Sequence, residues 1–239
     1  MNPTQISEKQ NQSEKIVVFG GAGFLGSHVA DVLSSRGYGV CIYDQNKSPY
    51  LKSNQEQVVG DILDTQAVLK AVSDAAYVYN FAGITDIFEA SQKPTETIQY
   101  NVLGNTIILE ACRKSQVQRY FLGSTIYVYS DRGGFYRASK QAAESVVEAF
   151  HEHFGLEYTI LRFGSLYGPR AQAWNSIYRY AHQAISQGTV EYIGTGEERR
   201  EYIHVQDAAE LSVDALSQDF TNQCVILTGT QSLTSAELL

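Results

Sequence analysis

The stretch that most constrains the fold lies near the start of the chain, where an apolar run is followed by three spaced glycines. Residues 16–19 read Ile-Val-Val-Phe, and Gly20, Gly23 and Gly26 follow in the sequence GGAGFLG. Apolar residues then recur at helical spacing. A strand, a glycine turn and a helix in this order hold a dinucleotide pyrophosphate, because the backbone can approach the phosphates and the helix start offers free amides. The pattern predicts a dinucleotide-binding domain.

Composition narrows the class of protein. The 239 residues are 44% hydrophobic, which is enough for a full core, and carry a net charge of −8. This acidic balance argues against nucleic-acid and acidic-membrane partners. Cys41, Cys112 and Cys224 show no disulfide or metal spacing, so we expect buried thiols, no metal site and a cytoplasmic location. Residues 1–13 are polar, which predicts a disordered tail rather than a signal peptide.

The rest of the chain alternates between expected strands and helices, which predicts an α/β fold with a doubly wound parallel sheet. Asp64 and Asp207 are expected to cap helices at their start, and Gly155 to end one. Residues 164–172 are expected to form a loop. The further strands are expected at 39–44, 57–61, 76–83, 119–124, 158–163, 189–193, 201–205 and 224–228, and the helices at 64–72, 95–114, 137–154, 176–186 and 207–216.

Ligands of such sheets bind beyond the carboxyl ends of the strands, where Gly20, Asp44, Asp61, Ala82 and Ser124 are all expected. An acid at the end of the second strand accepts hydrogen bonds from the adenosine ribose and repels a 2′-phosphate. Asp44 therefore favours NAD over NADP, although a lysine three residues on blurs that preference. Asp61 either sits beside adenine or is a solvated carboxylate.

Tyr136 and Lys140 are four residues apart on an expected helix and so share one face. An ammonium beside a phenol is expected to lower the tyrosine pKa, which makes Tyr136 a candidate general acid/base for a hydroxyl or carbonyl. Thr125 or Ser124 could hydrogen-bond the same oxygen, and Lys140 could also reach the nicotinamide ribose. Simple packing of Tyr136 is the alternative.

With these motifs in family order, the chain resembles an extended short-chain dehydrogenase/reductase of the NAD-dependent nucleotide-sugar epimerase/dehydratase family. The matching segments cover nearly the whole chain and lie at residues 20–26, 44, 60–62, 80–83, 101–104, 124–129, 136–140, 161–163, 167–170 and 200–207.

The resemblance implies NAD as cofactor and assigns roles to individual residues. It makes Tyr136 the acid/base with Lys140 as its partner, and Thr125 the catalytic hydroxyl with Ser124 as runner-up. Arg200 is expected to contact the substrate diphosphate, and Thr85, Ser165 and Asn175 are further candidate substrate contacts. Cofactor contacts are expected at Gly20, Gly23, Phe24, Leu25, Gly26, Asp44, Asp61, Ile62, Phe81, Ala82, Gly83, Tyr136, Lys140 and Phe163.

Two departures from the family pattern shape the functional hypothesis. Family dehydratases usually carry an acid just after the catalytic Thr, whereas this chain has Ile126 and Tyr127. This favours an NAD-dependent nucleotide-sugar epimerase that acts through a keto intermediate. Family chains also normally run on past Leu239, so we expect an NAD-binding domain at 14–163 and a small, truncated substrate lobe at 164–239.

Two alternatives stay open. One is an NAD(P)-dependent reductase or dehydrogenase of a keto-sugar or other carbonyl, and the other is a non-catalytic dinucleotide sensor or scaffold. The resemblance further implies a homodimer, paired through the helices expected at 95–114 and 137–154.

Overall fold

A seven-stranded, all-parallel sheet forms the centre of the molecule. The computed structural model describes residues 14–239, so the tail expected at 1–13 lies outside the described residues. The strand order reverses between β1 and β4, which is the topological switch point where such sheets bind ligands. The predicted doubly wound sheet is therefore confirmed. From edge to edge the strands are β3 (Gln55–Val59), β2 (Gly39–Asp44), β1 (Lys15–Phe19), β4 (Tyr77–Asn80), β5 (Arg119–Thr125), β6 (Glu157–Phe163) and β9 (Gln223–Leu227).

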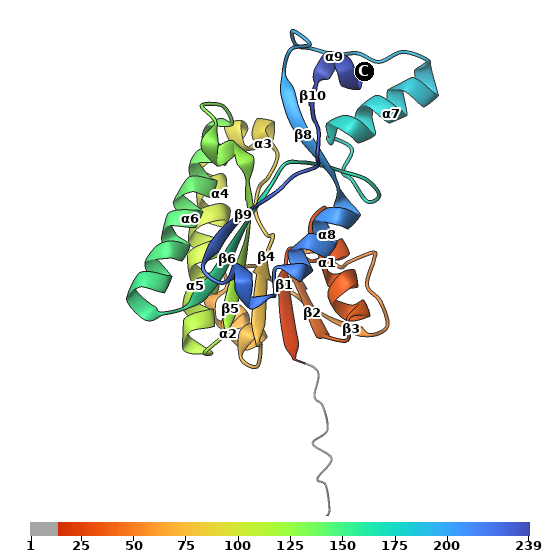
Figure 1. Cartoon of the computed structure of the whole chain (residues 1–239). Coiled ribbons are helices and arrows are strands. Elements are labelled where there is room, and N and C mark those ends of the chain that lie inside the picture. The colour runs from red at the N-terminus through yellow and green to blue at the C-terminus, as the bar shows by residue number, and fades with distance from the viewer. Residues whose placement is uncertain (1–13) are drawn as a thin grey trace, which may run out of the picture.

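Helices cover both faces of this sheet (Figure 1). α1 (Phe24–Ser35) and α8 (Val205–Asp214) pack on one face, and α2 (Thr65–Val72), α5 (Asn105–Lys114) and α6 (Gly134–Phe154) on the other. Because side chains alternate along a strand, β1 supplies Ile16 and Val18 to the first core and Val17 and Phe19 to the second. All four are fully buried, so burial on both faces explains why β1 is a continuous apolar run.

The predicted caps position two of these helices. The Asp64 carboxylate accepts hydrogen bonds from the backbone amides of Gln66 and Ala67, both at 3.0 Å, at the start of α2. Gly155 ends α6 with a φ of +70°, a left-handed conformation that glycine adopts without a steric penalty.

The helix expected over 95–114 is interrupted, so that prediction is wrong in one respect. The chain forms α3 (Ile87–Gln92) and α4 (Pro94–Ile98), then a π-helical segment η1 (Gln99–Gly104), and only then α5. The wider turn carries the buried Asn101, whose side chain hydrogen-bonds both backbone groups of Ile84. Segments of this kind are often found at functional sites.

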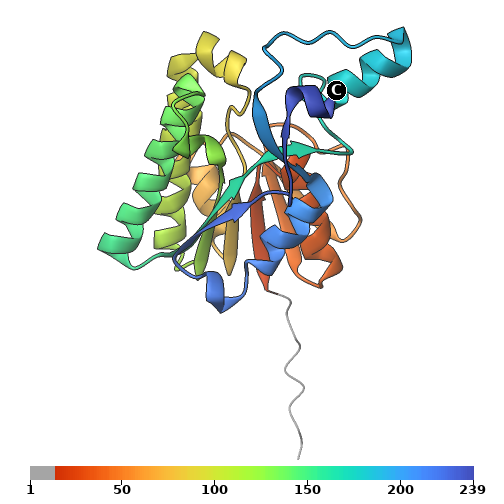
Figure 2. The same ribbon diagram turned by 45° about the horizontal axis from the view of Figure 1, so that its top comes forward.

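A second, three-stranded sheet forms a small lobe above the carboxyl edge of the main sheet (Figures 1 and 2). Its strands are β7 (Ser165–Tyr167), β8 (Arg199–His204) and β10 (Ser232–Thr234), accompanied by α7 (Ser176–Gln187) and α9 (Ser235–Leu238). β7 lies inside the stretch predicted as a loop. Short 3-10 turns, η2 (Ile126–Tyr129) and η3 (Gln218–Phe220), complete the described elements.

Three local predictions are wrong. Residues 189–193 form no strand, and Ile193 is fully exposed, because no neighbouring strand pairs with these β-branched and aromatic residues. α8 starts at Val205, and His204 rather than Asp207 caps it. Cys224 is exposed on β9 at the sheet edge, whereas Cys41 and Cys112 are buried as expected.

None of the helices found in residues 14–239 is long and apolar enough to cross a membrane.

Candidate active site

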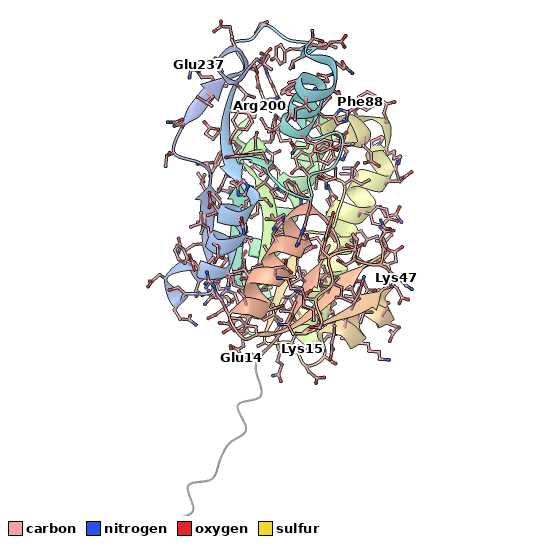
Figure 3. The ribbon with its side chains drawn as sticks, turned by 90° about the vertical axis from the view of Figure 1, so that its right-hand side faces the viewer. Glu14, Lys15, Lys47, Phe88, Arg200 and Glu237 are labelled. Carbon is pink, nitrogen blue, oxygen red and sulfur yellow. The ribbon has the colours of Figure 1, made fainter. Side chains whose placement is uncertain are left out.

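A cleft of about 870 Å³ lies where the carboxyl edge of the main sheet meets the small lobe, and every predicted site residue lines it. Lys47 and Arg200 both belong to its lining. In Figure 3 Arg200 lies high, on β8, and Lys47 lies lower, beside the sheet. The predicted residues that the fold brings together are Gly20, Gly23, Phe24, Leu25, Gly26, Asp44, Asp61, Ile62, Phe81, Ala82, Gly83, Thr85, Ser124, Thr125, Tyr136, Lys140, Phe163, Ser165, Asn175 and Arg200.

The glycine turn between β1 and α1 has no room for side chains. Gly20 has a φ of +74°, and a Cβ there would lie 2.7 Å from the backbone nitrogen of Ala82. A Cβ on Gly26 would lie 2.3 Å from the carbonyl oxygen of Gly20. Gly23 caps α1 without any side-chain hydrogen bond, so the first amides of the helix remain available to an anion. This cradle fits a dinucleotide pyrophosphate.

Asp44, the last residue of β2, connects the glycine turn to the neighbouring loop. Its carboxylate accepts hydrogen bonds from the backbone amides of Ala22 at 3.1 Å and Asn46 at 2.9 Å. The two oxygens of a carboxylate offer more acceptor sites than these two amides use, so Asp44 can also accept hydrogen bonds from ribose hydroxyls. The carboxylate thus fits the adenosine half of NAD.

Further along the cleft, the residues predicted to bind the adenine base follow the end of β3. The Asp61 side chain accepts a hydrogen bond from the Leu63 amide at 2.9 Å, and its carbonyl accepts one from the Tyr43 hydroxyl, also at 2.9 Å. Asp61 is exposed and Ile62 is buried beside it. At the other end the rings of Phe81 and Phe163 lie 6.3 Å apart and form an apolar wall.

Two buried asparagines, which the sequence reasoning did not name as site residues, shape the turn after β4. Asn80 accepts a hydrogen bond from the Ala82 amide at 3.0 Å. Asn101 accepts one from the Ile84 amide at 2.7 Å and donates to the Ser139 hydroxyl at 2.9 Å. For Asn101, the available signal was its place within an expected helix, because a buried amide needs hydrogen-bond partners.

Hydrogen bonds made by two side chains of α6, one helical turn apart, connect this helix to the end of β5. Lys140 Nζ donates to the Gly123 carbonyl at 2.9 Å. One turn further along, Glu144 accepts a hydrogen bond from Ser124 Oγ at 2.5 Å and forms an ion pair with Arg162 at 2.7 Å. The Ser124 proton is therefore committed to Glu144. Thr125 Oγ1 instead accepts from the Tyr127 amide at 3.2 Å, so its own proton is not committed to Glu144 and can interact with the Tyr136 hydroxyl.

The pKa values at the centre of the cleft contradict one prediction. Burial raises the pKa of Tyr136 to about 12, although the Thr125 side chain opposes the rise. Burial also lowers the pKa of Lys140 to about 8, opposed by the charge of Glu144. The expectation that Lys140 lowers the tyrosine pKa is thus wrong for the protein without ligand, because loss of water dominates the pKa of Tyr136 and Lys140 is not among the groups that shift it. Lys140 is still mostly protonated at pH 7.

The four predicted substrate residues differ in how they are engaged. Arg200 Nη1 donates to the Tyr127 hydroxyl at 2.6 Å. The Asn175 amide accepts from the Tyr178 backbone and donates to the Leu166 carbonyl, so it holds α7 against β7. Ser165 begins β7, and Thr85 is exposed on the loop before α3.

The sequence is similar to those of a known family and of several named proteins. Residues 16–226 match the model of a family described as the NAD dependent epimerase/dehydratase family. A UDP-N-acetyl-alpha-D-glucosaminuronate decarboxylase of Bacillus cytotoxicus is 28% identical over 238 residues, covering 89% of this chain and 74% of that protein. A putative UDP-glucose 4-epimerase of Methanocaldococcus jannaschii is 29% identical over 225 residues, covering 84% and 73%.

Among solved structures, the UDP-glucose 4-epimerase of Thermotoga maritima with UDP-glucose superimposes with a TM-score of 0.88. It is 26% identical, and the match covers 94% of this chain and 80% of that one.

Proposed function

The chain belongs to the NAD-dependent epimerase/dehydratase family, and on that premise we propose that it is an epimerase of a UDP-sugar. The observation that carries the proposal is one continuous cleft that joins the glycine turn, the Tyr136–Lys140 face of α6 and Arg200. A dinucleotide, an acid/base and a cation for a diphosphate are the three elements that such a reaction needs. Relatives named for UDP-sugars support the substrate class.

The fit to NAD rests on the glycine turn and on Asp44. The backbone contacts at Gly20 and Gly26 leave a cradle that a pyrophosphate fills, and Asp44 would hold the ribose hydroxyls. NAD, when bound, supplies the acceptor and donor of hydride. The protein contributes position and electrostatics around it.

In the proposed reaction Tyr136 takes the proton from a sugar hydroxyl as the carbon is oxidised and returns it after the keto intermediate has turned over. Thr125 would hydrogen-bond the same sugar oxygen. Lys140, protonated at pH 7, would favour the phenolate form of Tyr136 once the hydroxyl is aligned. Arg200 would bind the diphosphate, since a guanidinium suits a bidentate contact with phosphate.

The residues after Thr125 favour epimerisation over loss of water. Ile126 and Tyr127 both line the cleft, and neither offers a carboxylate. In the described part of the chain, the acids that line the cleft lie at the end of β2 or follow β3 or β4, and do not come from the segment that carries Thr125 and Tyr136. They are Asp44, Asp61, Asp86, Glu89 and Glu96.

Replacing Tyr136 by Phe tests the proposal. The variant keeps the ring but loses the acid/base, so we expect turnover of the preferred UDP-sugar to fall by about 100-fold or more, while NAD still binds. UDP-glucose, UDP-N-acetylglucosamine and UDP-glucuronic acid are the substrates to test, with product epimers separated by chromatography. Unchanged turnover in Tyr136→Phe refutes the assignment. Net loss of NADH during turnover with a keto-sugar would favour a reductase instead.

A homodimer is part of the same proposal. Ile98 on α4, Leu103 in η1 and Phe154 on α6 are large apolar side chains that are exposed in the single chain. Exposed apolar residues on neighbouring helices support a protein contact there. Light scattering coupled to size-exclusion chromatography tests it, and a monomer at micromolar concentration would contradict it.

A further inference from the structure

Tyr127 lies between two residues with proposed roles that are distant in sequence. It belongs to the η2 turn that follows β5. Its hydroxyl accepts the hydrogen bond from Arg200 Nη1 at 2.6 Å. On its other side, its ring meets the ring of Tyr136 edge-on, with centroids 6.4 Å apart and an interplanar angle of 71°. One side chain therefore touches both the cation of the small lobe and the acid/base of α6.

The conformation of Tyr127 is restricted by its surroundings. Its backbone amide donates to Thr125 Oγ1. Gly133 packs against the ring, since a Cβ there would lie 3.3 Å from Tyr127 Cδ1 and 3.1 Å from Arg137 Cβ. With Tyr136 on another side, the ring has little freedom to rotate. The hydroxyl is thus presented to the cleft at a defined place.

The Arg200 guanidinium is held by fewer contacts than the ring of Tyr127. It is half-buried on β8, and the bond to Tyr127 is the hydrogen bond that its guanidinium makes within residues 14–239. No carboxylate of these residues forms an ion pair with it. A long side chain loses conformational freedom when it binds a ligand. A partner that already orients it reduces that loss.

We propose that Tyr127 is a positioning residue that orients Arg200 for the diphosphate of a nucleotide ligand and holds this anion site in register with Tyr136. The inference rests on the proposed function. Only Nη1 of Arg200 is engaged by the phenol, so the other edge of the guanidinium can approach a phosphate in the bidentate manner that this group favours.

The variant Tyr127→Phe removes the hydroxyl and keeps the ring against Tyr136. We expect the dissociation constant for UDP, measured by calorimetry on the NAD-loaded protein, to rise about tenfold, as for the loss of one hydrogen bond to a charged group. The KM for the UDP-sugar should rise by a similar factor, with kcat within about threefold and NAD affinity unchanged. An unchanged UDP affinity overturns the proposal.

The same turn provides a matched control. Tyr129 also accepts a hydrogen bond from an arginine, Arg162, but it is exposed and does not line the cleft. Tyr129→Phe is therefore expected to leave UDP affinity unchanged. A tenfold loss in both variants would mean that the turn itself is disturbed, and would refute the specific role of Tyr127.

A double-mutant cycle separates positioning from direct contact with the ligand. If Tyr127 acts through Arg200, Tyr127→Phe should change UDP affinity by less than about twofold in an Arg200→Ala background. Equal losses in both backgrounds would show that the phenol binds the ligand by itself. Wild-type protein that binds NAD but no UDP would refute the proposed function, and this inference with it.

Discussion

Lys140 is expected to cost the protein stability, and its replacement by Met tests this. The side chain is 4% exposed, and burial lowers its pKa from 10.5 to about 8. This shift corresponds to a penalty of about 3 kcal/mol for the charged form in the folded state. Met removes the charge and retains a similar apolar length. It also leaves the Gly123 carbonyl without its donor, which costs about 1 kcal/mol.

The net expectation is that Lys140→Met stabilises the protein by about 2 kcal/mol at pH 7, which raises Tm by about 4–8 °C for a chain of this size. NAD affinity and turnover should fall, because the residue is part of the proposed machinery. A gain in stability with a loss of activity is the usual signature of a site selected for function.

The pH dependence provides a sharper test. Between pH 8 and pH 10.5 the unfolded chain still carries a proton on Lys140 that the folded protein has released. The stability of the wild type therefore rises with pH across this window relative to the variant. The stability gap should narrow from about 2 kcal/mol at pH 7 to below about 1 kcal/mol near pH 9.5.

Urea unfolding of both ligand-free proteins at pH 7 and pH 9.5 measures the gap. Because the other titrating groups are common to both proteins, their effects cancel in the difference. A variant less stable than wild type at pH 7, or a gap that does not change with pH, would refute the reasoning.

Four further substitutions address the glycine cradle and the proposed catalytic hydroxyl. Gly26→Ala places a methyl group 2.3 Å from the Gly20 carbonyl, so thermal melts and NAD titration should show a loss of about 2–3 kcal/mol and of NAD binding. Gly23→Ala meets the same oxygen at 3.2 Å and should lower NAD affinity with little change in Tm. Thr125→Ala should reduce kcat by at least about tenfold at near-normal stability. Ser124→Ala removes one of the donors to Glu144 and should cost about 1–2 kcal/mol in stability. If Ser124→Ala lowered kcat and Thr125→Ala lowered stability instead, Ser124 would be the catalytic hydroxyl and Thr125 the structural one.

Much of the fold could be predicted because its signals are local. The glycine spacing, the apolar run of β1 and the alternation of strands and helices together determine a switch point beside β1. Asp64 begins α2 and Gly155 ends α6 through contacts within a few residues, so both roles can be predicted from the local sequence. The predicted site residues could be brought to one cleft for the same reason, since the carboxyl ends of parallel strands share one edge.

The predictions that failed depended on partners distant in sequence. Residues 189–193 have the composition of a strand but find no strand to pair with. The π-helical turn places the Asn101 amide against the backbone of Ile84, 17 residues earlier in the sequence. His204 caps α8 because β8 runs directly into that helix.

The sequence by itself determined the type of fold and which residues lie at the cleft, because spacing and periodicity act over a few residues. Only the tertiary structure decided what those residues can do. It buried Tyr136 deeply enough that loss of water raised a pKa predicted to fall, and it committed the Ser124 proton to Glu144. It also brought Arg200 to Tyr127 across 73 positions. Burial and hydrogen bonding between distant segments depend on three-dimensional packing, which no local pattern encodes.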